Sequence, residues 1–334
     1  MPNIDDIKML IARMPELDPE PPPEEKKPEK PKEKPGDARV TAAEKPKVDP
    51  PKAADPPKPK RAPGAEKGKL TGPKWEEAQA VYDAIFAGGK ETVSVVIDLI
   101  TENDIGPAYK PRYVLHGMAV YACREGKEKE RAAMIAAILP EITGNKPKTT
   151  RAFLVRTLQA CADPAVIGAL APLLGDEELA DPAAAAMVEL ATISEGPKTG
   201  EASQIFRDAM GKSNGRARLA IIQALGSLKD RASIETLAQA AWDKDENVQV
   251  TALWALARTG DAGAIDPILK AADAPEGWLR RQATKAAFML AESFAAEKQK
   301  ENAGKIYRYL QQTRKGDEEK FVREAAERGL EGMK

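Results

Sequence analysis

The chain has 334 residues, enough for one to three ordinary domains, and its 51 Lys and Arg nearly balance its 52 Asp and Glu. A net charge of −1 lacks the positive excess that nonspecific binding to nucleic acid phosphates requires, so composition argues against a nucleic acid partner. The first residues do not form a signal-peptide pattern, and nothing later approaches the roughly 20 apolar residues of a membrane span. We therefore expect a cytoplasmic protein.

Residues 1–17 contain a predicted short amphipathic helix over 3–14. Asn3 can cap its first turn, and Asp5 and Asp6 favour that end of a helix. One face carries the large apolar side chains, namely Ile4, Ile7, Leu10, Ile11 and Met14. A helix this short does not persist alone in water, so we expect it to form by docking on a partner or on its own chain. A frayed terminus with chance apolar residues is the alternative.

Residues 18–73 are predicted to be a disordered spacer rich in Pro, Lys and Glu. Of the 27 prolines, 17 precede Lys74, together with 16 Lys and Arg and 14 Asp and Glu. Such a segment cannot bury enough apolar surface to offset the entropy of ordering it. In extended polyproline II form, some fifty residues could reach on the order of 150 Å. PxxP spacings such as Pro28 to Pro31 would also fit an SH3-like ligand, but they arise by chance in so proline-rich a stretch.

Residues 74–334 show helical periodicity that Gly, Asp, Asn or Pro interrupts about every 15 residues. The β-branched segment 91–100 also fits a helical face, so we expect a helix there. A front cap is predicted at 74–87. Seven helical pairs follow it: 91–102 with 110–124, 127–143 with 148–161, 164–175 with 181–195, 200–211 with 214–228, 231–242 with 246–259, 262–273 with 277–296, and 299–314 with 317–332.

A repeated unit underlies these pairs. Asp230 and Asp261 lie 31 residues apart, and the same interval separates Arg218, Gln249 and Arg280. A unit of this length signals a stacked array, because no single helical pair can bury its own apolar face.

The segment 243–269 resembles HEAT repeats of the variety named after phycobilisome lyases. The positions that carry this resemblance are Asp243, Asp245, Val248, Ala252, Leu253, Ala255, Leu256, Gly260, Asp261, Ala264, Ile265 and Ile268. The resemblance is strongest over 213–295 and weakest at the two ends. It implies an all-α fold, a right-handed α-solenoid of about seven HEAT-like helical pairs behind the disordered tail. It specifies a fold far better than a function.

The resemblance also implies hydrogen-bonded ladders between an Asp that ends one helix and an Arg early in the next. Residues in such places are Asp243, Asp317, Arg112, Arg151, Arg218, Arg280 and Arg323. Gln249 and Ala184 interrupt the arginine row, so an incomplete ladder of structural charges is expected.

Residue types that carry catalysis are scarce. His116 is the only histidine, which excludes multi-histidine metal sites, and its apolar neighbours predict a partly buried structural role. Cys123 and Cys161 lie outside any zinc-like spacing and are expected to be small buried side chains. There is no phosphate-binding GxxxxGK[ST] run. We expect no catalytic, metal or cofactor-binding residue, and a protein that is not an enzyme.

The second helices of such solenoids usually line the concave face. Five residues after the arginine position, the aligned units carry Arg156, Glu189, Gln223, Trp254, Lys285 and Arg328. Polar residues here indicate exposure, so Trp254 would be an aromatic on a wet stripe, with Arg258 one turn on and Arg281 on the next helix. An exposed Trp beside Arg and Lys is typical of binding hot spots. The alternative is that Trp254 packs between helices as core.

These observations predict an adaptor that binds a protein partner, an acidic or extended segment, in the concave groove. The predicted partner-binding residues are Gln223, Trp254, Arg258, Arg281, Lys285 and Arg156. In this hypothesis, residues 3–14 act as a second, tethered hook. One alternative is a lyase or regulatory protein related to bilin lyases, with the groove as its ligand pocket. Another is that residues 3–14 dock on their own solenoid and block the groove.

Overall fold

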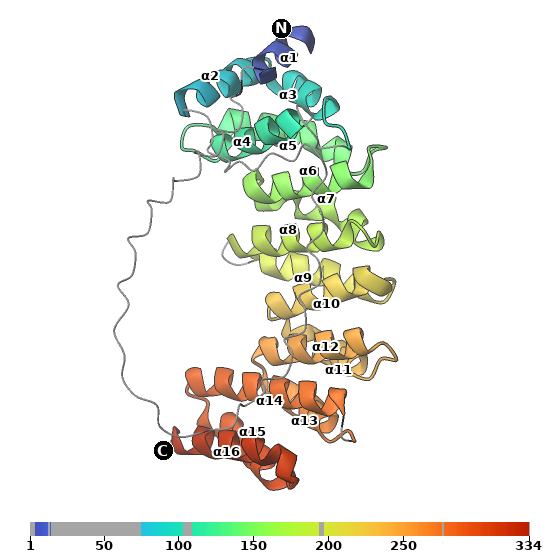
Figure 1. Cartoon of the computed structure of the whole chain (residues 1–334), viewed down its shortest axis with the longest axis vertical. Coiled ribbons are helices and arrows are strands. Elements are labelled where there is room, and N and C mark those ends of the chain that lie inside the picture. The colour runs from blue at the N-terminus through green and yellow to red at the C-terminus, as the bar shows by residue number, and fades with distance from the viewer. Residues whose placement is uncertain are drawn as a thin grey trace, which may run out of the picture.

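A computed structural model describes residues 4–12, 14, 75–102, 109–193, 197–275 and 277–333. Its helices stack in chain order, from α1 (Ile4–Ala12) and α2 (Trp75–Phe86) at one end to the last pair at the other (Figure 1). No strand occurs among these residues. The predicted spacer at 18–73 lies outside them. The all-α stack agrees with the predicted fold class.

Seven helical pairs follow α2 in the described ranges. They are α3 (Gly89–Asp98) with α4 (Lys110–Ala122), α5 (Glu128–Ile142) with α6 (Lys148–Cys161), α7 (Ile167–Leu170) between two 3₁₀ turns with α8 (Ala180–Ile193), α9 (Pro197–Met210) with α10 (Gly215–Ser227), α11 (Ile234–Ala240) with α12 (Glu246–Thr259), α13 (Ile265–Ala272) with α14 (Trp278–Ala296), and α15 (Lys300–Thr313) with α16 (Lys320–Glu331). Each falls on its predicted pair, and α3 confirms that the β-branched segment is helical.

The second helices of successive pairs pack directly on one another, from α4 through α6, α8, α10 and α12 to α14. Alanine, leucine and isoleucine fill one continuous core along the stack. At Gly226 the backbone of α10 approaches the backbone of α12 closely. A Cβ added at Gly226 would lie 2.7 Å from Ala255 Cα, closer than real Cβ atoms come. Small side chains thus set the spacing of the helices beneath one face of the stack.

Arginines near the start of second helices satisfy backbone carbonyls at the end of the first helix of the same pair. Arg151 Nε donates to Ile142 O at 2.7 Å, and Arg323 Nη1 donates to the carbonyl of buried Arg314 at 2.7 Å. Gln249 takes the same role, because its Nε2 donates to Asp243 O at 2.5 Å. Gln249 was predicted to interrupt the arginine row. It removes the positive charge at this position but keeps the hydrogen bond to the carbonyl.

Two other arginines near the start of second helices, Arg218 and Arg280, join neighbouring units, as the ladder predicts. Arg218 Nη1 lies 2.8 Å from Asp243 Oδ2, and Arg280 Nε lies 2.8 Å from Glu319 Oε1. The prediction of Asp317 as a ladder carboxylate was wrong. Asp317 begins a 3₁₀ turn and is exposed, and the turn brings Glu319, two residues later, against Arg280.

The N-terminal helix α1 docks on its own chain. It packs on α2, α3 and α4, and the side chains of Ile7, Ile11 and Met14 are at most 5% exposed. Lys110 Nζ donates to Ala12 O at 3.5 Å. The structure thus agrees with the alternative in which residues 3–14 dock on their own solenoid. The docked helix lies at the first end of the stack (Figure 1), however, and does not block the second-helix face further along.

Two expectations about single residues were wrong. His116 is exposed on α4, and Cys123 at the end of that helix is exposed as well. The Cys123 thiol donates to Ala160 O at 3.0 Å, across to α6. Cys161 is buried as predicted, and burial raises the pKa of its thiol to about 12.

Candidate functional site

Two adjoining hollows lie on the face that the second helices form. The first, of about 490 Å³, is lined by Gln223, Ser227, Val250, Thr251, Trp254, Ala255 and Arg258. The second, of about 310 Å³, is lined by Gln159, Asp181, Ala184, Ala185, Val188, Glu189, Ala220, Gln223, Ala224 and Ser227. Because Gln223 and Ser227 line both, the hollows form one groove, which we call the second-helix groove. It crosses α6, α8, α10 and α12, which follow one another along the stack (Figure 1).

Helical periodicity decides which side chains of α12 enter the groove. Val250, Trp254 and Arg258 lie four residues apart on one face, whereas Leu253 and Leu256 on the opposite face are fully buried. Asp245 caps the helix by accepting from Asn247 N at 2.8 Å. Gly260 ends the helix in the left-handed conformation, at φ 61°. The helix is therefore fixed at both ends in the register that turns these three side chains outward.

Trp254 does not belong to the core. Its side chain is 41% exposed, so the alternative in which it tucks between helices does not describe the structure. Ala255 beside it is buried and lines the groove floor. The indole is thus supported from below and open to solvent above.

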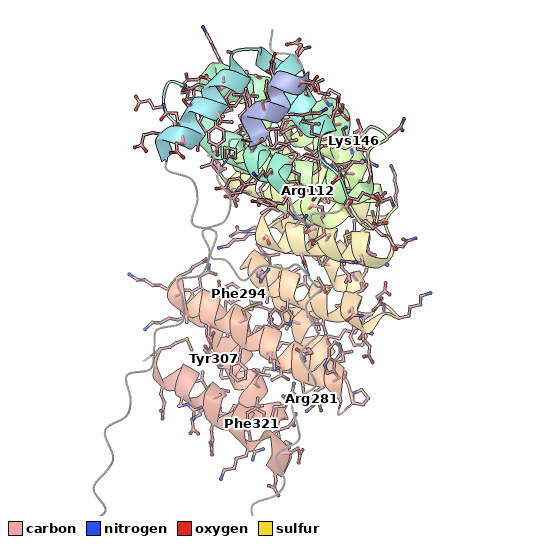
Figure 2. The ribbon with its side chains drawn as sticks, turned by 45° about the horizontal axis from the view of Figure 1, so that its top comes forward. Arg112, Lys146, Arg281, Phe294, Tyr307 and Phe321 are labelled. Carbon is pink, nitrogen blue, oxygen red and sulfur yellow. The ribbon has the colours of Figure 1, made fainter. Side chains whose placement is uncertain are left out.

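The structure brings together most of the predicted site residues. Gln223, Trp254 and Arg258 meet in the larger hollow. Arg281 and Lys285 are exposed on α14, the next helix along the stack, and Arg281 lies toward the C-terminal end in Figure 2. Arg281 and Lys285 line neither hollow, but α14 packs on α12, the helix that carries Trp254 and Arg258. Arg156 is exposed on α6, outside both hollows and separated from the others by α8.

The charged side chains along this face are unpaired. Within the described ranges, no ion pair or side-chain hydrogen bond involves Asp181, Glu189, Arg258, Arg281 or Lys285. Elsewhere on the stack, charged side chains at helix starts pair with those of the next unit, as the arginine ladder shows. The charged side chains along this face can therefore form ion pairs and hydrogen bonds with a bound molecule without first breaking any within the protein.

Sequence reasoning missed part of the groove. Asp181, Val188, Ser227 and Val250 line it but were not predicted. Ser227 and Val250 lie one turn, and Asp181 about two turns, from the aligned stripe position, so extending the alignment along the helices would have found these three. Val188 directly precedes the stripe residue Glu189 and lies on the adjoining part of the helix surface. Ile193, one turn beyond Glu189, is 63% exposed and extends the same face.

The described residues contain no group of three or more His, Cys, Asp or Glu side chains that could hold a metal ion. None of the helices in these ranges is both long enough and apolar enough to cross a membrane.

Comparison with known proteins supports the architecture. The HEAT repeat family matches residues 203–288, which run from α9 into α14 and include every residue that lines the larger hollow. The chain contains HEAT repeats. The match does not extend to the phycobilisome-lyase variety that the sequence resembles. HEAT arrays are solenoids that expose an extended binding surface, and they commonly act as protein-interaction scaffolds. No curated protein matches the chain.

Among solved structures, the HEAT array resembles Kap121p bound to Nup53p at 14% identity and a TM-score of 0.48, covering 77% of this chain and 30% of that one. It resembles Kap121p bound to Pho4p at 13% identity and a TM-score of 0.46, covering 78% and 32%. An engineered protein matches at 18% identity and a TM-score of 0.35, covering 77% and 80%. The chain thus spans under a third of the Kap121p chain.

Proposed function

We propose that this HEAT-repeat protein is a non-catalytic interaction scaffold that holds an acidic or extended segment of a partner protein in the second-helix groove. The observation that carries the proposal is the exposed indole of Trp254 in a hollow shared with Gln223 and Arg258, with Arg281 and Lys285 exposed on the adjoining helix α14. Aromatic and arginine side chains dominate the binding energy of protein interfaces. Guanidinium groups also form strong charge-assisted hydrogen bonds with carboxylates.

The N-terminal helix adds a second contact to this proposal. Residues 15–74 tether α1 to α2, and two linked contacts bind more tightly than either alone when both sites can be reached together. The apolar face of α1 is occupied by α2, α3 and α4, so a partner would have to displace α1 before using it. No observation on the described residues favours the lyase alternative, and we do not propose it.

Selection from a displayed library of random peptides of about twelve residues tests the groove. The full chain serves as bait, and selected peptides are then measured against Trp254→Ala and Trp242→Ala. Trp242 is the matched control, because its side chain is 46% exposed but lies outside the groove. We expect peptides whose affinity falls about 30-fold in Trp254→Ala, the loss of about 2 kcal/mol that defines a hot spot, and stays unchanged in Trp242→Ala. Peptides that bind both variants like the unmodified protein would overturn the proposal.

A further inference from the structure

The second-helix groove has opposite charges at its two ends. Asp181 and Glu189 line its first half on α8. Arg258 lines the other half, and Arg281 and Lys285 are exposed on α14, which packs on α12. Between them, Gln223 is uncharged. The groove therefore runs from an acidic end through a polar middle to a basic end that contains Trp254.

The two ends of the groove favour bound charges of opposite sign. Asp181 and Glu189 lie eight residues apart on α8, about 12 Å along its axis, so each presents its own negative charge. A bound segment with the opposite order of charges would meet a complementary charge at both ends. A uniformly acidic segment would meet a complementary charge at one end and a like charge at the other.

We infer that the groove binds a bipolar extended peptide, with a basic residue at the α8 end that Asp181 and Glu189 make acidic, a large apolar residue on Trp254, and an acidic residue at the end that Arg258, Arg281 and Lys285 make basic. This inference rests on the proposed function and deepens it, because it states the chemistry of the partner and the order of its side chains. The opposite signs at the two ends fit a peptide better than a nucleic acid, whose phosphates would meet the carboxylates of α8.

Helix spacing sets the spacing of the peptide side chains. Packed helices lie about 9 Å apart, and an extended chain rises about 3.3 Å per residue. The step from α8 to α12 covers two helix spacings, about 18 Å, which corresponds to five or six peptide residues. The step from α12 to α14 covers one spacing and corresponds to about three residues. The apolar residue is thus expected about six positions from the basic residue and about three from the acidic one.

Synthetic peptides of about ten residues test this order. One carries Lys, Leu and Glu at the predicted spacings in an Asn, Ser and Thr background, and its matched control exchanges the Lys and the Glu. Both are also made in the reversed sequence, because the groove does not fix the direction of the chain. Binding to the full-length protein is measured by fluorescence anisotropy at low and moderate salt. A twelve-nucleotide oligothymidine is included as the nucleic acid probe.

We expect the predicted order to bind at least tenfold more tightly than the exchanged control in one chain direction, with the difference shrinking as salt rises. The fourfold variant Asp181→Lys, Glu189→Lys, Arg281→Glu, Lys285→Glu should reverse that preference. All four positions are exposed, so the helices should be retained, which circular dichroism checks. Reversing exposed charges outside the groove, in Glu235→Lys with Lys212→Glu, should leave the preference unchanged.

The outcomes separate the two proposals. Binding that depends on Trp254 but ignores charge order would overturn the bipolar inference and leave the scaffold function standing. Failure to obtain any peptide that depends on Trp254, from the library or by synthesis, would overturn both. Tighter binding of oligothymidine than of every peptide would overturn the inference in favour of a nucleic acid ligand.

Discussion

The contact between α10 and α12 is set by the lack of a side chain at Gly226. In Gly226→Ala, the new Cβ would lie 2.7 Å from Ala255 Cα and 2.9 Å from Ala255 Cβ, so the two helices must separate. Overpacking of this kind costs about 1–3 kcal/mol, whereas replacing glycine by alanine within a helix otherwise gains about 1 kcal/mol. We therefore expect a net loss of stability of up to about 2 kcal/mol.

Gly168→Ala is the matched control, because Gly168 is helical and exposed and an added Cβ there meets nothing within 4 Å. It should raise stability by up to about 1 kcal/mol. Urea unfolding and hydrogen exchange of α10 and α12 measure both variants, and exchange localises the effect, since repeat arrays need not unfold in one step. The double variant Gly226→Ala with Ala255→Gly should recover part of the loss. A stabilised Gly226→Ala would refute the reasoning.

Three further predictions follow from residues described above. Ile7→Ala should speed proteolysis and hydrogen exchange in α1, because Ile7 is fully buried, whereas Ile4→Ala should not, because Ile4 is 47% exposed. At pH 8, a thiol reagent should modify Cys123 promptly and Cys161 only on unfolding, since Cys161 is buried and its pKa is raised; equal rates would contradict this. Hydrogen bonds from Arg280 lower the pKa of Glu319 in the folded protein. That group therefore adds stability at neutral pH that is lost on acidification, so Glu319→Gln should flatten the fall in urea midpoint between about pH 5 and pH 3.

The repeat period made most of the fold predictable. Aspartates and arginines at a constant interval fixed the register, and the register fixed the helical pairs within a few residues at each end. The same alignment placed Trp254 on the exposed stripe. The alignment could not decide whether the indole would lie in the groove or between helices. Either location gives the indole apolar contact on at least one side.

The residues that were misjudged depend on neighbours outside their own helix. His116 and Cys123 have apolar neighbours in sequence, but no adjacent helix covers their side chains, which are exposed. The ladder carboxylate is Glu319 and not Asp317, because a 3₁₀ turn over these residues precedes α16 and brings Glu319 against Arg280. The docking place of α1 was likewise beyond reach, since an amphipathic pattern shows that a face is covered but not by what.

The docking of α1 at the end of the stack has a consequence for how the chain responds to cleavage. Residues 15–74 connect two anchored points, Met14 and α2, so the contact between α1 and the stack is intramolecular. A single cut anywhere in that connection would make the same contact bimolecular. A nine-residue helix held by three buried side chains would then diffuse away at cellular concentrations. One proteolytic event would thus uncover the surfaces of α2, α3 and α4 on which α1 packs.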